Sequence, residues 1–435
     1  MHPLSTLMEQ RQNGIKTGIY SCCSANEFVL RSAIEAAAEN NCYVLIEATA
    51  NQVDQYGGYT GMKPSDFAAF VLSIAEEYQF PKEKLILGGD HLGPLTFASL
   101  SEHEAMERSK ELVRQYVLAG FTKIHLDTSM RIADDSASCP LSDDIIASRA
   151  AILCRECEDA YIERLKAFPD SIAPVYVIGS EVPIPGGAQE EEDSVSITGK
   201  DDALKTINSF TEHFKKAGAS SALERVIALV VQPGVEFGDG TVLEYDRKKA
   251  NELCSVLCGR NLIFEAHSTD YQTKKCLREM VEDGFAILKV GPALTFALRE
   301  AIFALDMIEA EMSELKGLKP TGFRDKLNNC MLSDDRNWAK HYHGDEKEKA
   351  FARAFSFSNR DRYYLTDPCI VEALNSLIAN LEKYEIPLTL LSQYMPMQYT
   401  AVRNNTIKNE PKQLIKHRIR NCIDDYLFAC SDAKD

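Results

Sequence analysis

The chain has 435 residues, of which 45% are hydrophobic and 26% charged, and its formal net charge is −17. These proportions are typical of a globular protein, and the negative charge argues against nucleic acid or an anionic membrane surface as the main partner. No apolar run approaches the ~20 residues that a membrane-spanning helix needs.

The N-terminus and the cysteine content together predict a cytoplasmic protein. The first residues, Met1-His2-Pro3-Leu4, lack the charged and apolar regions of a signal peptide. Thirteen cysteines are scattered along the chain. An odd number without a regular spacing indicates reduced thiols rather than a disulfide framework.

Eight short apolar stretches have the composition of buried strands, and each is followed by a segment with apolar residues at helical spacing. In chain order they are Gly18–Tyr20, Tyr43–Ile46, Leu85–Gly89, Lys123–Leu126, Val175–Gly179, Ile227–Val231, Leu262–Phe264 and Ala286–Leu288. The predicted helices include Pro64–Tyr78, Glu104–Ala119, Asp143–Phe168, Lys205–Ala217 and Ala297–Met312. Eight alternating strand and helix units predict an α/β fold of the TIM (β/α)8 barrel type.

A boundary signal rich in glycine and proline follows the last of these helices, at Lys316–Gly322. We therefore predict a barrel over residues 1–312 and a mostly helical extension over residues 313–435. The extension is a candidate for contact with a partner, or for covering the barrel mouth with Arg360, Arg362 and Tyr363. We interpret its basic stretch, Lys408 to Arg420, as a solvated helix face or a subunit contact.

Polar side chains capable of chemistry follow nearly every predicted strand. They are Ser21, Glu47, Asp90, His91, Asp127, Ser180, Glu181, Gln232, Glu265, His267 and Lys289. The active site of a TIM barrel lies at the carboxyl ends of its strands. The sequence therefore predicts that these residues form one ring around a common centre.

The strongest local motif is Leu87-Gly88-Gly89-Asp90-His91-Leu92-Gly93-Pro94. Glycines at a strand end allow the backbone to approach a ligand closely. Asp90 then offers a catalytic acid or base beside His91, a candidate metal ligand. The alternative is a buried histidine that simply bonds to its neighbour.

A second motif, Phe264-Glu265-Ala266-His267-Ser268-Thr269-Asp270, places Glu265 and His267 on one face of a strand. His267 and His91 are a candidate imidazole pair for a divalent ion. Glu181 is our first choice for a third ligand, with Asp127 and Glu47 behind it. His125 lies two residues from Asp127 and can share its face. Carboxylates at strand ends also serve as structural acceptors for backbone amides, so that role stays open for each of them.

Lys289 ends the last predicted strand, and the turn Gly291-Pro292 and Thr295 follow it. A desolvated lysine here could form a Schiff base, or act as a cation that holds a phosphate or carboxylate. We favour the second role, since barrels often bind phosphate at this position. After the fifth strand, Val182-Pro183-Ile184-Pro185-Gly186-Gly187 and the acidic run 189–193 form a candidate lid, with a disordered surface insertion as the alternative for the acidic part.

Taken together, these motifs resemble the accessory, non-catalytic Z-type subunit family of tagatose-1,6-bisphosphate aldolase, from galactitol and N-acetylgalactosamine catabolism. The resemblance covers essentially the whole chain. It rests on blocks at Leu45–Thr49, Asn51–Val53, Gly57–Met62, Leu87–Pro94, Lys123–Asp127, Gly179–Gly187, Val231–Phe237, Glu265–Thr273 and Phe285–Leu305, with shorter matches at Ser358, Arg360, Arg362–Tyr364, Ser392–Tyr394 and Pro396.

The resemblance implies a TIM-barrel core and a hetero-oligomer with a class II aldolase catalytic subunit. That partner is a zinc enzyme that cleaves tagatose 1,6-bisphosphate into dihydroxyacetone phosphate and glyceraldehyde 3-phosphate. The Z-type subunit is expected to support the activity and stability of its partner without aldolase activity of its own. Some members carry a kinase label, but the sequence has no GxxxxGK[S/T] phosphate loop.

The residues also favour a second hypothesis, a metal-dependent 4-epimerase of a ketose, a ketose phosphate or a sugar acid. A divalent ion, Zn first and Mn, Co or Ni as alternatives, would polarise the C2 carbonyl and stabilise an enediolate after C3–C4 cleavage. Re-addition of the rotated aldehyde would invert C4. A third hypothesis is a scaffold whose pocket is vestigial.

For the first two hypotheses we predict three groups of site residues. The catalytic candidates are Asp90, Glu47, Asp127 and Lys289. The substrate-binding candidates are Gln52, Gln232, Ser268, Asp270, Gly291, Thr295 and Arg360. The metal-ligand candidates are His91, Glu181 and His267.

Overall fold

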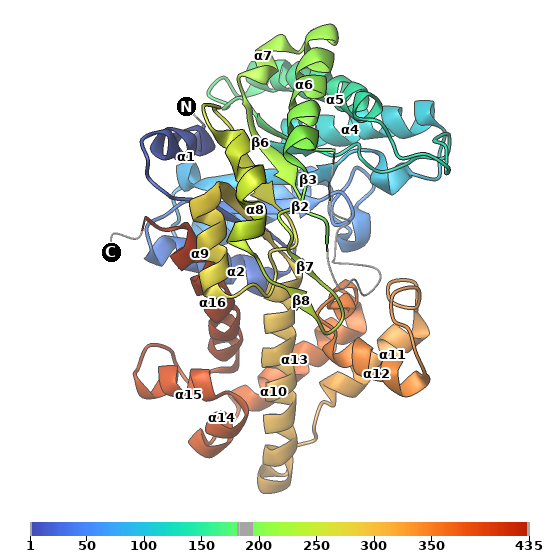
Figure 1. The fold of residues 1–435 in the computed structure, drawn as a ribbon. Coiled ribbons are helices and arrows are strands. Elements are labelled where there is room, and N and C mark those ends of the chain that lie inside the picture. The colour runs from blue at the N-terminus through green and yellow to red at the C-terminus, as the bar shows by residue number, and fades with distance from the viewer. Residues whose placement is uncertain (1, 181, 183–194, 433–435) are drawn as a thin grey trace.

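The computed structural model describes residues 2–180, 182 and 195–432. Its centre is a closed barrel of eight parallel strands, in the order β1-β10-β9-β6-β5-β4-β3-β2 (Figure 1). The strands are β1 (Ile19–Cys23), β2 (Val44–Thr49), β3 (Leu85–Leu92), β4 (Lys123–Leu126), β5 (Val175–Ile178), β6 (Val226–Val231), β9 (Ile263–Ala266) and β10 (Phe285–Val290). The predicted TIM barrel is confirmed.

The strands extend slightly further than their apolar composition indicates. Glu47, Asp90, Glu265 and Lys289 lie inside β2, β3, β9 and β10 rather than directly after them. Their charged side chains can occupy strand positions because alternation turns them into the barrel, where they pair with one another. A prediction from the apolar pattern alone therefore places the ends of these strands too early in the sequence.

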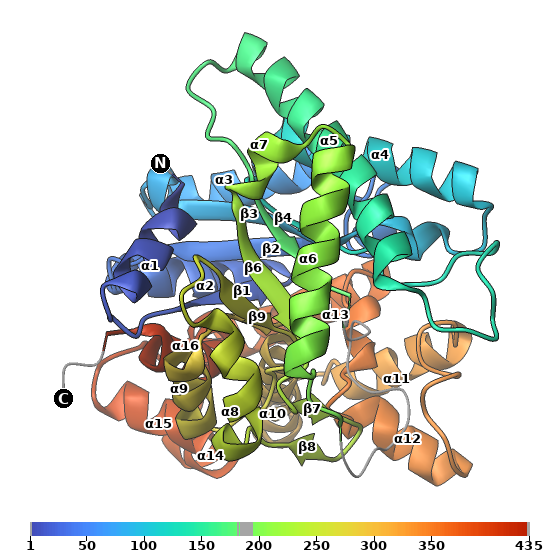
Figure 2. The ribbon, with the colours of Figure 1, turned by 45° about the horizontal axis from the view of Figure 1, so that its top comes forward.

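Helices surround the barrel and follow the strands in the predicted alternation (Figure 2). They are α2 (Glu27–Glu39), α3 (Pro64–Glu77), α4 (Glu102–Ala119), α5 (Asp143–Ala167), α6 (Lys200–Lys216), α7 (Ser220–Leu223), α8 (Arg247–Cys254), α9 (Lys274–Asp283) and α10 (Pro292–Lys316). The five predicted helices are all present, with ends shifted by a few residues. Ser101 and Ser142 cap α4 and α5 with their side chains, a common helix start.

Two separate apolar cores hold these layers together. One fills the space between the strands and the outer helices and contains residues such as Ile46, Val71 and Leu112. The other fills the lower half of the barrel interior with Leu45, Ile263 and Ile287, and α1 (Pro3–Gln12) closes it from below through residues such as Leu4. The lower barrel is thus a packed core, and the upper barrel is left for polar side chains.

The extension begins where α10 ends at Gly317 and is helical, as predicted. Its helices are α11 (Phe323–Ser333), α12 (Glu346–Phe355), α13 (Pro368–Glu382), α14 (Leu388–Tyr394), α15 (Pro396–Arg403) and α16 (Pro411–Cys430), with a 3-10 turn, η5, at Arg360–Tyr363. A division of the chain at residue 312 stays a prediction, since α10 runs through that position without a break.

The last helix, α16, returns to the barrel and packs against α2, α9 and α10. Three of its basic residues pair with carboxylates on barrel helices. The pairs are Lys416–Glu35, Arg418–Glu300 and Arg420–Glu39. The interpretation of Lys408 to Arg420 as a solvated face or subunit contact is therefore wrong for these three residues, although Lys408 and Lys412 are exposed.

The thirteen cysteines are all free thiols, as predicted. The described helices include none that is both long and apolar enough to cross a membrane. The predicted ligand Glu181 lies outside the described residues, and so does nearly all of the predicted lid.

Candidate functional site

A pocket opens at the carboxyl ends of the barrel strands, on the face where the sequence predicts a site. Side chains after β1, β2, β3, β9 and β10 line it, together with residues of the extension around η5. From the barrel side these include Cys23, Asn51, Gln52, Tyr59, Asp90, His91, His267, Ser268, Asp270, Lys289, Gly291 and Thr295. Arg362 and Tyr363 of the extension complete the wall, so this part of the extension covers the mouth as predicted.

His91 is held by a carboxylate from the neighbouring strand. Its Nδ1 lies 2.7 Å from Oδ2 of Asp127, and Oδ1 of Asp127 accepts hydrogen bonds from the amide and hydroxyl of Ser129. His91 has a φ of 49°, in the left-handed region that a non-glycine residue rarely adopts. Such backbone strain is typical of functional positions. Here it turns the imidazole towards the barrel axis.

Asp90 connects this histidine to a second one, His125 on β4. Oδ1 of Asp90 lies 2.9 Å from Nδ1 of His125, and Oδ2 lies 3.6 Å from Nε2 of His91. Burial alone would raise the pKa of Asp90, but the charges of His91 and Lys289 hold it well below its usual range. Asp90 is therefore an ionised carboxylate.

His267, after β9, is the third imidazole of the group. Its Nε2 lies 3.0 Å from Oε1 of Glu265, two residues earlier on the same face. Burial lowers the pKa of His267 to about 3, so the ring is neutral at physiological pH. Neutral imidazole is the form that binds a metal ion.

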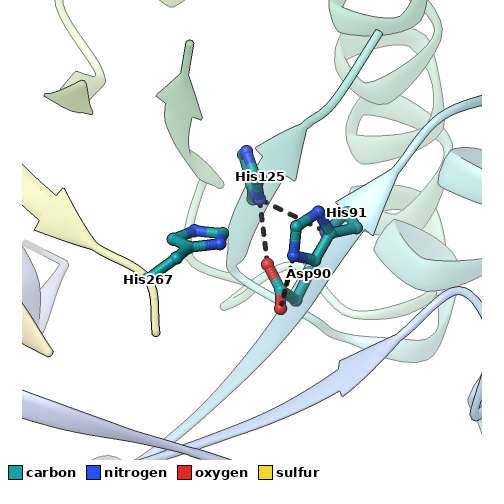
Figure 3. A group of neighbouring side chains, drawn as sticks. All are labelled: Asp90, His91, His125 and His267. Carbon is teal, nitrogen blue, oxygen red and sulfur yellow. Dashed lines mark hydrogen bonds and ion pairs between the residues drawn. The ribbon is translucent and has the colours of Figure 1, made fainter. Parts of the chain in front are cut away.

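The three histidines and Asp90 form one compact cluster (Figure 3). One ligand atom from each residue lies within 4.8 Å of the others, and the ring centroids are 4.8 to 5.2 Å apart. Each imidazole is paired with a carboxylate, the arrangement that orients metal-binding histidines in proteins. Nε2 of His125 is buried and has no hydrogen-bond partner among the described residues. The donor set fits a divalent ion such as Zn²⁺.

Beneath the histidines lies a network of buried charges inside the barrel. Nζ of Lys123 is 2.6 Å from carboxylate oxygens of both Glu47 and Glu265. Nζ of Lys289 contacts Glu47 and lies 2.8 Å from Oδ2 of Asp90. Burial disfavours both ammonium groups, but these carboxylates outweigh it and raise the pKa of each lysine above its usual value. Both lysines are charged.

The network has an excess of negative charge. Glu47, Asp90, Asp127 and Glu265 bring four carboxylates, and Lys123 and Lys289 bring two ammonium groups. All six side chains are at most 6% exposed. Buried charge is costly unless it is compensated. Burial opposes the charging of His91, but Asp90 and Asp127 outweigh it and raise the pKa of this imidazole, so His91 carries part of the balancing charge. A bound divalent cation would take over that role and supply two positive charges.

Gly88 has a different role from the one that the sequence indicates. A Cβ at position 88 would lie 2.7 Å from Cγ and Oε1 of Glu47. The missing side chain therefore makes room for this carboxylate and not for the close approach of a ligand. Gly89 does the same for Leu92 and Tyr116, since a Cβ there would lie 2.5 and 2.7 Å from their side chains.

Of the predicted substrate-binding residues, Gln52, Ser268, Asp270, Gly291 and Thr295 line the pocket. Gln232 and Arg360 are not among the residues that line it. Oε1 of Gln232 accepts hydrogen bonds from the amides of Gly234 and Val235, so its side chain supports its own loop. Nη1 of Arg360 points to the carbonyl oxygen of Asn337.

Protein groups already occupy the predicted anion site after β10. Oδ1 of Asp270 accepts hydrogen bonds from the amides of Gly291 and Ala293, at the start of α10. Burial raises the pKa of Asp270 to about 6. Lys289 is paired with Glu47 and Asp90, as described above. Neither the helix start nor this lysine is free for a phosphate in this arrangement.

Arg362 is the basic side chain of the extension that reaches the pocket wall. Its Nη1 donates to the carbonyl oxygens of Ser358 and Asn359, and its Nη2 donates to the hydroxyl of Tyr363 at 2.9 Å. Among the residues that the structure describes, these three bonds leave two of the five guanidinium N–H groups for a ligand. The Tyr363 ring in turn contacts Tyr59, with 4.9 Å between ring centroids.

Sequence reasoning missed Lys123 and Tyr59. The apolar pattern makes Lys123 the first residue of a predicted strand and gives it no role in the site. The spacing of Lys123, His125 and Asp127 nevertheless places all three on one face of that strand. The alternation of side chains along a strand was therefore a signal that the side chain of Lys123 points into the barrel. Tyr59 lies in a glycine-rich loop, and no local pattern indicates that its ring reaches the pocket.

Comparison with protein families gives one match over nearly the whole chain. Residues 4–431 match the family described as D-tagatose-1,6-bisphosphate aldolase subunit GatZ/KbaZ-like.

Comparison with solved structures gives a relative of the same fold over nearly the whole chain. It is the crystal structure of a probable tagatose 6 phosphate kinase from Sinorhizobium meliloti 1021, with 42% identity and a TM-score of 0.86, covering 95% of this chain and 100% of that one. The YdjI aldolase from Escherichia coli K12 also matches, at 13% identity and a TM-score of 0.41, covering 90% of this chain and 98% of that one. The fructose-bisphosphate aldolase from Campylobacter jejuni matches with 14% identity and a TM-score of 0.42, covering 87% of this chain and 92% of that one.

Proposed function

Because the chain belongs to the D-tagatose-1,6-bisphosphate aldolase subunit GatZ/KbaZ-like family, we propose that it is the accessory component of a class II D-tagatose-1,6-bisphosphate aldolase. In this role it binds a catalytic subunit and supports its activity and stability in the degradation of tagatose 6-phosphate or galactitol. The proposed assembly is a cytoplasmic hetero-oligomer. Membership of the family over residues 4–431 carries this part of the proposal.

The pocket of this chain takes part in the proposed function by binding a divalent ion and a ketose or ketose phosphate. The observation that carries this part is the cluster of three imidazoles around Asp90, each oriented by a carboxylate. A scaffold with a vestigial pocket has no need to maintain a buried set of charges, which is costly to stability. His91, His125 and His267 would hold the ion, which would polarise a carbonyl of the bound sugar, and Asp90 beside them would act as the acid–base group.

The chain's own residues then bind the sugar and move its protons. Asp90 is ionised and lines the pocket, so it can accept the proton of a substrate hydroxyl. Lys289, 2.8 Å from Asp90, stabilises the ionised form of this carboxylate. The free N–H groups of Arg362 suit a phosphate or a sugar hydroxyl, and Ser268 and Asn51 offer further polar contacts in the same wall.

The alternative function is a metal-dependent 4-epimerase of a ketose, a ketose phosphate or a sugar acid. The favouring observation is that the acid–base group and the imidazole cluster lie in one chain, so this chain has the groups for its own turnover. The bond between C3 and C4 would break as the C4 hydroxyl loses its proton. After rotation of the aldehyde the bond would form on the opposite face, and the proton would return to the C4 oxygen.

An NMR product assay separates these functions. The purified chain is incubated with Zn²⁺ or Mn²⁺ and tagatose 1,6-bisphosphate, first alone and then with a class II catalytic subunit. The variants are Asp90→Asn and His91→Ala, and Asp144→Asn, an exposed carboxylate outside the pocket, is the control. The accessory role predicts no turnover by the chain alone and higher aldolase activity of the catalytic subunit when the chain is added.

Each alternative gives a different result. Formation of the C4 epimer by the chain alone, abolished by either pocket variant, would establish the epimerase. Stimulation of the partner that survives both variants would show a scaffold and overturn the role of the pocket. Failure of the chain to stimulate or to bind the catalytic subunit would overturn the accessory role itself.

A further inference from the structure

Two cysteines and an aspartate meet in the helical extension, away from the barrel mouth. Cys330 lies near the end of α11, Asp367 caps the N-terminus of α13, and Cys369 lies in the first turn of α13 (Figure 1). One ligand atom from each residue lies within 4.8 Å of the others. The sequence analysis attaches no role to these residues, which are separated by nearly forty positions along the chain.

The surroundings of the three residues suit the entry of an ion. Cys369 is exposed and Cys330 and Asp367 are half-buried, so the cluster is open to solvent on one side. Oδ1 of Asp367 accepts a hydrogen bond from the amide of Cys369 at 2.9 Å, which orients the carboxylate. The Asp367 side chain is therefore oriented by the first turn of α13 before any ligand binds.

We propose that Cys330, Asp367 and Cys369 form a binding site for a soft divalent metal ion, with Zn²⁺ as the class of ion that fits best. Two thiolate sulfurs and one carboxylate oxygen are the donors that zinc accepts in tetrahedral sites, and solvent can supply the fourth ligand. This inference is independent of the function proposed for the barrel mouth.

Metal binding exchanges two sulfur–hydrogen bonds for two metal–sulfur bonds, and the two thiol protons pass to solvent. Without a metal both groups stay thiols. Burial and the charge of Asp367 raise the pKa of Cys330 to about 12, and hydrogen bonding to Asp367 raises the pKa of Cys369. Lys326 is the cation that acts on Cys369. A divalent ion would stabilise the thiolates far more strongly than this exposed ammonium does.

The position of the site gives it a structural consequence. Thr366, directly before Asp367, lines the barrel pocket, as do Arg362 and Tyr363 of the same segment. A metal ion that joins α11 to the start of α13 would therefore fix the C-terminal end of the segment that covers the barrel mouth. The extension would hold its pocket wall by a metal clamp in addition to apolar packing.

Cobalt substitution tests the site in the full-length protein. Co²⁺ bound to thiolate gives a charge-transfer absorption band, whereas the three histidines of the barrel mouth contribute no sulfur. The chain is reduced, freed of metal and titrated with Co²⁺ as wild type, Cys369→Ser and Asp367→Asn. Two controls are Cys258→Ser, an exposed thiol elsewhere, and Cys23→Ser, because Cys23 lies beside Glu47 and Asp90.

We expect the thiolate band in the wild type and in both controls, its loss in Cys369→Ser and at least a tenfold weaker affinity in Asp367→Asn. Because Cys369 is exposed, its serine variant should keep the circular dichroism spectrum of the wild type. Absence of the band in the wild type, or its survival in Cys369→Ser, would overturn the proposal. So would a count of free thiols, in denaturant without reductant, that falls two short of thirteen and traces to a Cys330–Cys369 disulfide.

Discussion

The lower and upper halves of the barrel interior are built from the same strands and have opposite chemistry. In β9, Ile263 belongs to the apolar lower core and Glu265 to the buried charge network, and His267, directly after the strand, belongs to the imidazole cluster. In β2, Leu45 and Glu47 show the same change over two residues. The lower half is closed by α1, whereas the upper half opens into the pocket.

Along one strand, two successive inward-facing residues can therefore have different roles. The lower residue packs in the apolar core, and the next one carries a charge in the site. The lower half packs side chains without polar atoms, which is the general way in which a barrel core is filled. The upper half contains four carboxylates and two ammonium groups, which replace apolar packing with paired charges. Burying ion pairs rarely stabilises a fold more than apolar residues of the same volume would. The charged upper half is therefore explained by the metal and sugar binding that we propose for it, and not by stability.

The largest effect is expected for Lys123→Met in the charge network. The substitution keeps the length of the side chain but leaves Glu47 and Glu265 without the ammonium group that lies 2.6 Å from both. Breaking a buried ion pair in this way costs about 3–5 kcal/mol. Urea denaturation should show this loss in the free energy of unfolding. A variant as stable as the wild type would contradict the assignment of Lys123 as the balancing charge.

A smaller loss of stability is expected for Leu45→Ala in the lower half. Leu45 is fully buried and packs in the apolar core of the barrel, and such truncations cost about 2–5 kcal/mol. Metal affinity at the mouth should stay that of the wild type, since Leu45 belongs to the apolar lower core and not to the imidazole cluster. A clear change in metal affinity would show that the two halves are coupled and not separate.

Asp127→Asn tests the upper half without a large effect on the fold. Asparagine keeps the shape of the side chain but weakens the hydrogen bond that orients His91 at 2.7 Å. Loss of such a partner costs about 10- to 100-fold in metal affinity. Competition with a chelator measures this change, and Glu107→Gln, an exposed carboxylate on α4, is the matched control. Equal affinities for wild type and Asp127→Asn would show that His91 binds no metal.

The smallest effects are expected in the pH dependence of the free energy of unfolding. Asp270 at the mouth and His2 at the opposite end of the barrel should change it in opposite directions. Burial raises the pKa of Asp270 at the mouth from 3.8 to about 6, so the folded state binds more protons and stability falls as pH rises through this window. Burial lowers the pKa of His2, at the start of α1, from 6.5 to about 4. The unfolded state then binds more protons, and stability rises with pH between these values.

Difference curves of unfolding free energy against pH measure both groups. The curves compare the wild type with Asp270→Asn and with His2→Asn. Asparagine offers a side-chain oxygen to the same backbone amides, in place of a carboxylate oxygen of Asp270 and of Nδ1 of His2. From pH 4 to 6 the wild type should lose stability relative to the first variant and gain it relative to the second. Slopes of the same sign would contradict the burial assigned to one of the two groups.

The sequence was sufficient to predict the barrel and to place Asp90, His91 and His267 together in one candidate site, whose function stays a prediction. Polar residues at strand ends identify Asp90, His91 and His267 because parallel strands bring their carboxyl ends to one face. The sequence did not reveal which charged side chains form ion pairs between different strands. The contacts of Lys289 with Glu47, and of Lys123 with Glu265, join residues that are more than a hundred positions apart and depend on the closure of the barrel.

The misjudged residues have local explanations. Arg360 and Arg362 both lie in η5, and only the direction of the turn decides that Arg362 reaches the pocket while Arg360 points to Asn337. The sequence predicts solvated basic residues on α16 because their carboxylate partners lie on barrel helices that are distant along the chain. Gln232 satisfies loop amides, a role that no spacing in the sequence distinguishes from ligand binding.

The most direct test of the central claim is a Zn²⁺ titration of the full chain at the barrel mouth. The titration uses the Cys369→Ser background, so that thiolates of the extension do not contribute, and compares it with the same chain carrying His267→Ala in addition. We predict one tightly bound Zn²⁺ per chain in the background protein and its loss when His267 is replaced. No binding in the background protein, or equal binding in both, would contradict a metal site formed by the three histidines beside Asp90.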